Sequence, residues 1–261
     1  MPRKLMASST KRDGPANATP PPNYKVQRRE SMHVGATHST LCIEGTEAFE
    51  TTTVDLAGLP LRIRQHSEMA FCTGCRLWDS SIALARWILA HGVPWVANKR
   101  VLELGSGCGL AGLAATREAK HVRLTDGEAR LLPNLRFNAD QLAGVPVEVA
   151  HLNWSDTPDK LTAEHGTWDV VLGADLVYSS GCVAPLARAI SALLKPGGAL
   201  LMCSPSGRHG LEQLVTALRA AGMRCERSVL DAELLRGAAC QGNEAEVRAH
   251  PFVLLRACKA V

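Results

Sequence analysis

Val101-Leu102-Glu103-Leu104 runs directly into Gly105-Ser106-Gly107-Cys108-Gly109, and this junction is the most informative part of the chain. An aliphatic run that breaks on glycines is typical of a buried strand that ends in a tight turn. The next six residues are rich in helix formers, and a strand, a glycine turn and a helix bring a ligand against backbone N–H groups at the helix N-terminus. A dinucleotide-binding loop requires glycine where Leu110 stands. The loop therefore argues against a bound pyrophosphate and indicates another nucleoside-containing ligand.

Downstream of this loop, strand patterns alternate with helix patterns. Strands are expected over 101–105, 121–125, 147–152, 168–174 and 199–203, each followed by a helix, over 109–119, 128–142, 157–165, 182–194 and 209–221. Five such repeats predict an α/β fold with a parallel sheet covered by helices on both faces. Two further strands, over 224–230 and 251–258, have only a polar loop with Gly237, Gly242 and Asn243 between them. We expect these two strands to pair as an antiparallel C-terminal edge.

The residues before the glycine loop predict a small β-hairpin followed by a helix. Two alternating segments, 52–56 and 59–64, flank Gly58, which is the expected turn residue. The segment 77–88 predicts a helix that Asp79 or Ser80 caps at its N-terminus.

Charge divides the chain into a basic tail and a nearly neutral domain. Residues 1–30 hold seven basic and two acidic side chains, a net charge of +5, and the whole chain carries +4. The remaining residues therefore sum to −1, which argues against a nucleic-acid-binding surface on the folded part. Residues 1–40 contain Pro20-Pro21-Pro22 and few large apolar side chains. We expect 1–40 to be a disordered basic tail and 41–261 to be the folded domain.

The composition also bears on location. No apolar run approaches the roughly 18–20 residues that span a bilayer, and the N-terminus lacks the apolar core of a signal peptide. Nine cysteines follow no repeating spacing, which is typical of reduced thiols. Cys72-Thr73-Gly74-Cys75 has no second pair, so packing is expected here rather than zinc. We expect a cytoplasmic protein that can also be nuclear, without a membrane partner.

Several residues that follow the expected strands are candidates for a site, because ligands of open parallel sheets bind at the carboxyl ends of the strands. Asp126 can accept hydrogen bonds from both hydroxyls of a ribose, although it can also cap a helix. Trp154 can stack on a purine ring, although core packing is the better interpretation when it is taken alone. Asp175 and Tyr178 place a carboxylate and a phenol at the same edge, with capping and packing as the alternative.

Taken together, these motifs resemble the S-adenosylmethionine-dependent methyltransferases with a Rossmann-like seven-strand sheet, and among them the family-16 protein-lysine methyltransferases. The resemblance covers roughly residues 50–258. It is carried by 101–110, Leu124-Thr125-Asp126 with Asn134 and Asn138, Asn153-Trp154, Ala174-Asp175-Leu176-Val177-Tyr178 and Leu77-Trp78-Asp79-Ser80-Ser81.

The resemblance implies S-adenosylmethionine as cofactor and no metal. The cofactor contacts it implies are Trp78, Glu103, Gly105, Ser106, Gly107, Asp126, Trp154 and Ala174. In this arrangement Asp126 holds the ribose, Trp154 neighbours the adenine and Trp78 borders the methionine end. Asp175 and Tyr178 are the implied catalytic residues, which shape the entrance for a substrate lysine.

The function that the resemblance implies is N-methylation of a lysine in a non-histone protein, such as a chaperone, an elongation factor or calmodulin, by a monomeric enzyme. Two alternatives stay open on the same fold. One is a small-molecule N-methyltransferase, which needs a lid that residues 1–50 could supply. The other is a cofactor-binding scaffold without activity. Nucleic-acid methylation is disfavoured because no Asn-Pro-Pro-aromatic or Asp-Pro-Pro-aromatic tetrad follows the fourth strand.

Overall fold

The computed structural model describes residues 38–42, 48–56, 58–66, 72–142, 147–236 and 251–261. Most of the expected tail over 1–40 and the loop with Gly237, Gly242 and Asn243 lie outside these residues. Within the described part, no helix is long and apolar enough to cross a membrane.

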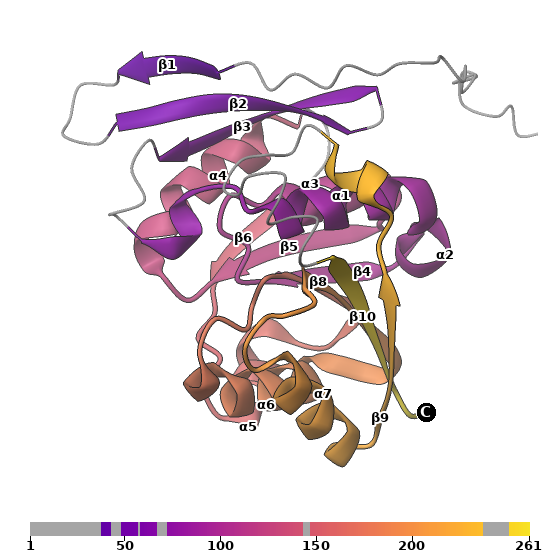
Figure 1. Ribbon diagram of the computed structural model, residues 1–261. Coiled ribbons are helices and arrows are strands. Elements are labelled where there is room, and N and C mark those ends of the chain that lie inside the picture. Colours follow the sequence, from indigo (N-terminus) through magenta and orange to yellow (C-terminus); the bar gives the residue numbers. More distant parts are fainter. Residues whose placement is uncertain (1–37, 43–47, 57, 67–71, 143–146, 237–250) are drawn as a thin grey trace, which may run out of the picture. The chain divides into compact units, whose positions relative to one another are not determined.

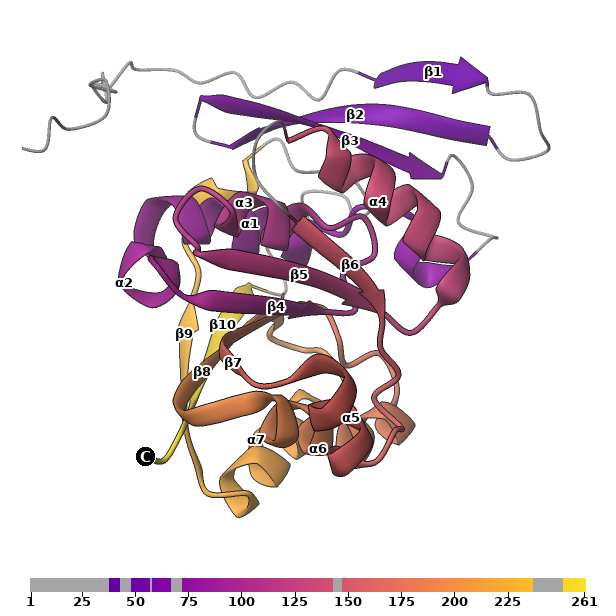
Figure 2. The same ribbon diagram turned by 180° about the vertical axis from the view of Figure 1, so that it is seen from behind.

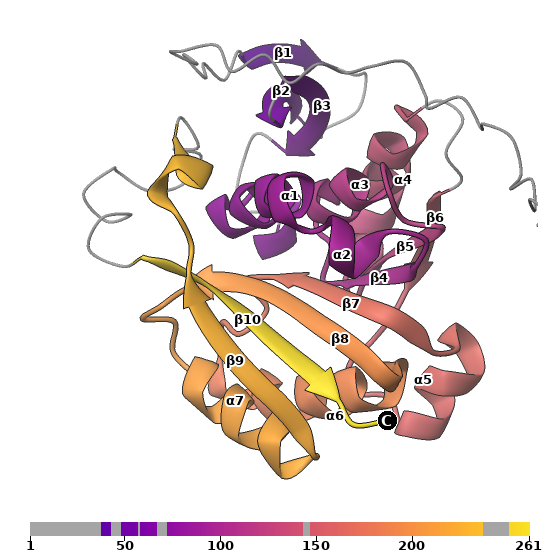
Figure 3. The same cartoon turned by 90° about the vertical axis from the view of Figure 1, so that its right-hand side faces the viewer.

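The main sheet has seven strands in the order β6-β5-β4-β7-β8-β10-β9. Their bounds are β4 Arg100–Leu104, β5 His121–Asp126, β6 Val147–His151, β7 Trp168–Ala174, β8 Leu194–Pro205, β9 Met223–Val229 and β10 Phe252–Lys259. The pairs from β6 to β8 are parallel, and β10 lies antiparallel between β8 and β9 (Figure 3). The predicted parallel sheet and antiparallel edge are confirmed. The strand order reverses between β4 and β7, which is where ligands of such sheets bind.

Helices cover both faces of this sheet (Figure 1). They are α1 Asp79–His91, α2 Val93–Val96, α3 Leu110–Ala115, α4 Leu132–Asp140, α5 Pro158–His165, α6 Val183–Leu193 and α7 Leu211–Ala220. One apolar core joins α1 and α3 to the sheet and a second joins α6 and α7 to the other face. The alternation along β4 follows the two cores: Val101 belongs to the first, and Leu102 and Leu104 belong to the second.

A separate three-stranded antiparallel sheet precedes α1. It contains β1 His38–Cys42, β2 Ala48–Leu56 and β3 Leu59–His66. The predicted hairpin is confirmed, since β2 pairs with β3 and Gly58 at the turn has a φ of +87°. The strand β1 was not predicted. Figure 2 shows this sheet beside α4, and two asparagines of α4 hold it: Arg64 N donates to Asn138 Oδ1 at 2.8 Å, and Arg64 Nε donates to Asn134 Oδ1 at 2.6 Å.

Two local predictions were wrong. Asp79 and Ser80 do not cap α1, because both are buried inside its first turn and Trp78 occupies the N-cap without a side-chain hydrogen bond. The helix expected over 128–142 is divided into a 3₁₀ turn η2 (Ala129–Leu131) and α4, with Pro133 in the first turn of α4. Proline suits a helix start because it has no N–H to donate.

Candidate cofactor and acceptor site

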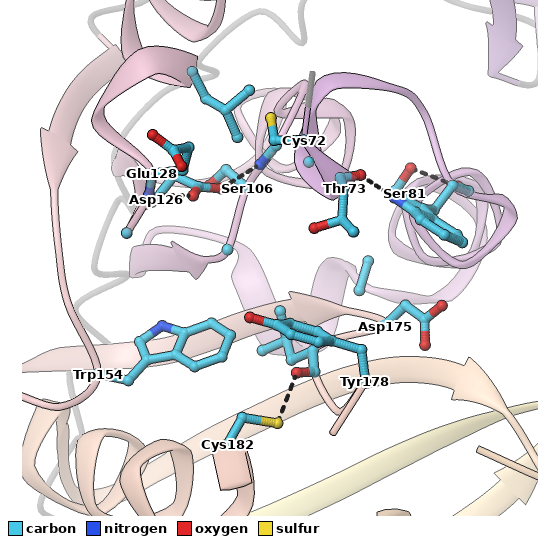
Figure 4. Close-up of a pocket in the computed structure, with 18 of the residues that line it drawn as sticks. Cys72, Thr73, Ser81, Ser106, Asp126, Glu128, Trp154, Asp175, Tyr178 and Cys182 are labelled. Carbon is cyan, nitrogen blue, oxygen red and sulfur yellow. Dashed lines mark hydrogen bonds between the residues drawn. The ribbon is translucent and has the colours of Figure 1, made fainter. Parts of the chain in front are cut away.

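A cavity of about 590 Å³ opens at the carboxyl ends of the central strands, a size that suits a small molecule. Nine of the ten predicted site residues line it: Trp78, Gly105, Ser106, Gly107, Asp126, Trp154, Ala174, Asp175 and Tyr178. In Figure 4, Asp126 and Asp175 lie toward opposite ends of the cavity, with Trp154 and Tyr178 along one side. The sequence therefore predicted a set of residues that the fold brings together.

The glycine loop after β4 presents bare backbone to this cavity. Gly105 and Gly107 have φ values of +54° and +53°, in the left-handed region that favours glycine. A Cβ atom on Gly105 would lie 2.9 Å from the Leu176 side chain and 3.1 Å from the Trp154 ring. A Cβ atom on Gly107 would lie 2.8 Å from the carbonyl oxygen of Gly74. Both backbone shape and the space around the loop require glycine.

Ser106 ties the loop to the neighbouring strand β5. Its N–H donates to the carbonyl of Thr125 at 2.8 Å, and its Oγ accepts from Thr125 N at 3.0 Å. The same hydroxyl donates to the carbonyl of Glu103 at 3.2 Å. These bonds occupy the Ser106 side chain, so its contribution is to fix the loop before a ligand arrives.

Asp126, at the end of β5, is buried and holds the loop from the other side. Its Oδ2 accepts from Gly107 N at 2.9 Å, and its Oδ1 accepts from Glu128 N at 2.9 Å. Burial raises the pKa of Asp126, and these backbone N–H bonds oppose the rise. Glu128, rather than Asp126, is the N-cap of η2. Each carboxylate oxygen keeps a second lone pair, so Asp126 can still accept from the two hydroxyls of a ribose.

Two tryptophans line the cavity, and they differ in the hydrogen bonding of their indole N–H groups. Trp78 Nε1 donates to the carbonyl of Thr73 at 2.9 Å. Trp154 Nε1 is buried and has no hydrogen-bond partner among the described residues. An unpaired buried donor of this kind costs about 1–3 kcal/mol. A glycine loop that excludes side chains, a buried carboxylate and an indole ring on the cavity wall together fit a nucleoside cofactor such as S-adenosylmethionine.

Glu103 is the exception among the predicted site residues, because it does not line the cavity. Its side chain is 1% exposed, and Oε2 accepts from Gly112 N of α3 at 3.1 Å. The alternation of β4 turns Glu103 toward the core that contains α3, away from the strand end. Burial raises the pKa of this carboxyl to about 8. The structure thus corrects the expected cofactor contact: Glu103 supports the helix behind the loop.

The opposite end of the cavity contains Asp175, Tyr178 and a residue that sequence reasoning missed, Arg208. Asp175 has a φ of +55°, which is unusual for a residue other than glycine, and its N–H donates to the carbonyl of Cys203 at 2.9 Å. Arg208 Nε donates to Asp175 Oδ1 at 2.6 Å, and Arg208 Nη2 donates to Oδ2. Burial raises the pKa of Asp175, and Arg208 opposes this rise. Tyr178 is 64% exposed at the rim.

The Cys72–Cys75 segment packs against the glycine loop. Cys75 Sγ donates to the carbonyl of Cys72 at 2.7 Å, and Cys108 Sγ donates to the carbonyl of Cys75 at 3.6 Å. Cys72 itself lines the cavity, and burial raises the pKa of its thiol to about 11. In the part of the chain that the structure describes, no group of His, Cys, Asp and Glu could hold a metal ion. The Cys75 and Cys108 thiols therefore pack here and donate to backbone carbonyls.

A family model described as lysine methyltransferase matches residues 56–219. The chain belongs to the lysine methyltransferase family. It is 30% identical over 146 residues to protein N-lysine methyltransferase METTL21A of Danio rerio, across 55% of this chain and 66% of that protein. It is 33% identical over 154 residues to calmodulin-lysine N-methyltransferase of Arabidopsis thaliana, across 56% of this chain and 50% of that protein. The chain thus spans between half and two thirds of the length of these two relatives.

Comparison with solved structures shows that this chain has the fold of methyltransferases. A TehB-like SAM-dependent methyltransferase from Corynebacterium glutamicum is 13% identical, with a TM-score of 0.50, over 73% of this chain and 92% of that one. A chain assigned as a methyltransferase and complexed with S-adenosylhomocysteine (SAH) is 12% identical, with a TM-score of 0.59, over 80% of this chain and 56% of that one. At this identity the likeness establishes the fold.

Proposed function

We propose that this chain is an S-adenosylmethionine-dependent protein-lysine N-methyltransferase that acts on a non-histone protein. The proposal rests on one observation above the others: the glycine loop, Asp126 and Trp154 meet in a single cavity that also contains Asp175 and Tyr178. Membership of the lysine methyltransferase family supports it. The relatives named for calmodulin and for EEF1A make calmodulin and elongation factors the first acceptors to test.

The proposed reaction requires this chain mainly to position the methyl donor and the acceptor. S-adenosylmethionine, when bound, supplies a methyl group on a sulfonium that is already a good leaving group. The acceptor lysine has an ordinary pKa near 10.4, so presenting it as a neutral amine at pH 7.4 costs roughly 4 kcal/mol. Exclusion of water from the cavity lowers this cost because it disfavours the ammonium form. The residues therefore have to align, desolvate and accept hydrogen bonds from the amine.

In this proposal Asp175 and Tyr178 take this role. A carboxylate oxygen of Asp175 can accept a hydrogen bond from the amine, which orients the lone pair. The exposed ring of Tyr178 offers an apolar wall to the methylene chain of the lysine. Burial raises the pKa of Tyr178, so its phenol stays protonated at neutral pH and serves as a wall and a donor.

The experiment that tests the proposal uses methyl-labelled S-adenosylmethionine and three acceptor pools: a hypomethylated cell lysate, recombinant unmethylated calmodulin and a metabolite extract. We expect a labelled protein band, and mass spectrometry of its peptides should place the methyl group on a lysine. The Gly105→Arg variant is the matched control and should leave the band unlabelled.

Two other outcomes would contradict the proposal. Label confined to the metabolite fraction would favour the small-molecule alternative, which needs a lid that residues 1–50 could supply; most of these residues lie outside the described ones. Absence of label in every pool, with SAH still bound, would favour the inactive scaffold.

A further inference from the structure

Arg208 is held firmly in the wall of the cavity by its backbone. It lies on the turn between β8 and α7, where its N–H donates to the carbonyl of Pro205 at 3.1 Å and its carbonyl accepts from Leu211 N at 3.2 Å. The same turn is tied to the residue before β10, since Ser206 N donates to the carbonyl of Pro251 at 2.9 Å. The backbone from which the Arg208 side chain projects is therefore anchored to the sheet.

The contact between Arg208 and Asp175 uses both carboxylate oxygens, one for Nε and one for Nη2. Such bidentate pairs are the most directional that arginine makes. The Asp175 side chain is 7% exposed and that of Arg208 is 31% exposed, so the carboxylate is the deeper partner. Both residues line the cavity. An incoming acceptor therefore meets a carboxylate whose charge is already compensated.

This compensation matters for the protonation state of an acceptor amine. An unpaired carboxylate close to an ammonium group favours the charged form and raises the pKa of the amine, by about 1–3 units at short range. A guanidinium at the same place acts in the opposite direction. Each Asp175 oxygen still has a lone pair for the amine N–H, so orientation is retained while the attraction for a cation is reduced.

We propose that Arg208 is a positioning residue, which orients and neutralises Asp175 so that the acceptor end of the cavity receives a neutral amine rather than a cation. The inference rests on the proposed methyltransferase function and adds a charge requirement to it. Arg208 thereby acts on the protonation state of the acceptor amine and not on cofactor binding.

The other titratable groups around Asp175 do not substitute for Arg208. Burial raises the pKa of the Cys203 thiol of β8 well above its ordinary value, so this group is neutral. Tyr178 is neutral for the same reason, and Cys182 faces Tyr178 from the 3₁₀ turn that precedes α6. Asp126 lies across the cavity and is hydrogen-bonded to backbone N–H groups. Next to Arg208 in the chain, His209 is exposed.

The test compares two ligands that differ at the methyl-transfer position, so it needs no acceptor protein. SAH carries nothing there, and sinefungin carries a C–NH₃⁺ group in place of the S–CH₃⁺ group. The Kd of each is measured by titration calorimetry between pH 6.5 and 9. At pH 8 the Arg208→Met variant should bind sinefungin roughly tenfold more tightly relative to SAH than the wild type does, because Asp175 is then uncompensated. SAH itself should bind both proteins equally.

Matched variants separate charge from packing. In Asp175→Asn/Arg208→Met the sinefungin preference should return to the wild-type value, and in Asp175→Asn alone it should fall below it, because the Arg208 cation is then unpaired. Arg188→Met, on the exposed side of α6, is the control for charge removal and should change neither ligand. If Arg208→Met loses SAH binding through misfolding, Arg208→Gln and Asp175→Asn carry the same comparison.

An unchanged ratio of the two affinities in Arg208→Met or Arg208→Gln, with SAH binding intact, would overturn this inference and leave the proposed function standing. Failure of the wild type to bind SAH would instead refute the proposed function, on which the inference depends. Because no acceptor is present, failure to find a methylated lysine does not affect the measurement.

Discussion

The two ends of the cavity are built in different ways. The proposed cofactor end is built around backbone groups that bond to nearby side chains: Gly107 N donates to Asp126 Oδ2, and Thr125 N donates to Ser106 Oγ. The acceptor end is made of side chains, and its central pair, Asp175 and Arg208, is 33 residues apart in the chain. A scaffold built of backbone tolerates little change, whereas side chains on loops can be exchanged without altering the fold. If the proposed function holds, cofactor choice is fixed by the fold, and acceptor choice by a few replaceable residues.

The largest effect, confined to the cofactor end of the cavity, is expected from a substitution at Gly105. In Gly105→Arg the new side chain would start 2.9 Å from Leu176 on a backbone with φ of +54°, and it would enter the cavity. We expect SAH binding to be lost altogether by titration calorimetry, and methyl transfer with it. Gly222→Ala is the control, since φ there is +81° but no atom lies within 4 Å. It should lose only about 1 kcal/mol of stability and bind SAH normally. Retained SAH binding in Gly105→Arg would place the cofactor elsewhere.

A smaller effect is expected at Asp126. Asn has one acceptor oxygen in place of two, so Asp126→Asn loses a charge-assisted bond to the loop and its charge toward the ribose. The Kd for SAH should rise by roughly 10- to 100-fold. Asp169→Asn removes another carboxylate, at the amino end of the central strand β7, which accepts from Arg100 N at 2.8 Å and from Lys195 Nζ at 2.8 Å. Its SAH affinity should equal that of the wild type. Equal affinity in Asp126→Asn would argue against the ribose contact.

Tyr178 tests the acceptor end alone. Removing the ring in Tyr178→Ala should lower turnover of the labelled protein acceptor by about tenfold, the size of one aromatic contact, while SAH affinity is unchanged. Tyr178→Phe keeps the wall and should retain most activity. A loss of SAH binding in Tyr178→Ala would mean that the two ends are not independent.

Glu103 should have no effect on SAH affinity, because its side chain lies behind the loop. It should instead change how stability depends on pH. Between its ordinary pKa of 4.5 and its folded pKa of about 8, the unfolded chain has released the Glu103 proton and the folded chain keeps it. Wild-type stability therefore falls as the pH rises through this range.

The Glu103→Gln variant cannot lose a proton and should keep its bond from Gly112 N. We expect its free energy of unfolding, measured with denaturant, to rise relative to that of the wild type from pH 5 to pH 8, by roughly 3 kcal/mol at pH 8. Parallel pH profiles for the two proteins would show that Glu103 is ionised in the fold, and weaker SAH binding would restore its predicted cofactor contact.

Most of the fold was predictable from the sequence, because strand and helix periodicity repeats regularly after Val101. The cofactor end was predictable for the same reason, since its residues follow strands directly. Glu103 was misplaced because the resemblance gives a position but not the face of β4 toward which a side chain turns. β1 was missed because its segment lies in a region whose composition favours disorder.

Arg208 was missed for a different reason. It follows a predicted strand by several residues in a turn, and its partner Asp175 follows another strand. Nothing local in the sequence couples the two, and the adjacency of β7 and β8 is what brings them together. A search for charged residues after every strand end would have included Arg208, although it would not have paired it with Asp175.

The position of β10 has a consequence for how the protein is made. β10 lies between β8 and β9 although it follows both in the chain, and the Pro251 carbonyl just before it fixes the turn that carries Arg208. While the ribosome is still translating residues 251–259, β9 has no neighbour in the sheet, and the Arg208 turn lacks its anchor. The glycine loop and Asp126 have by then already emerged. A nascent chain can thus form the glycine loop and its bond to Asp126 early. The turn that sets Arg208 beside Asp175 gains its anchor only at the end of synthesis.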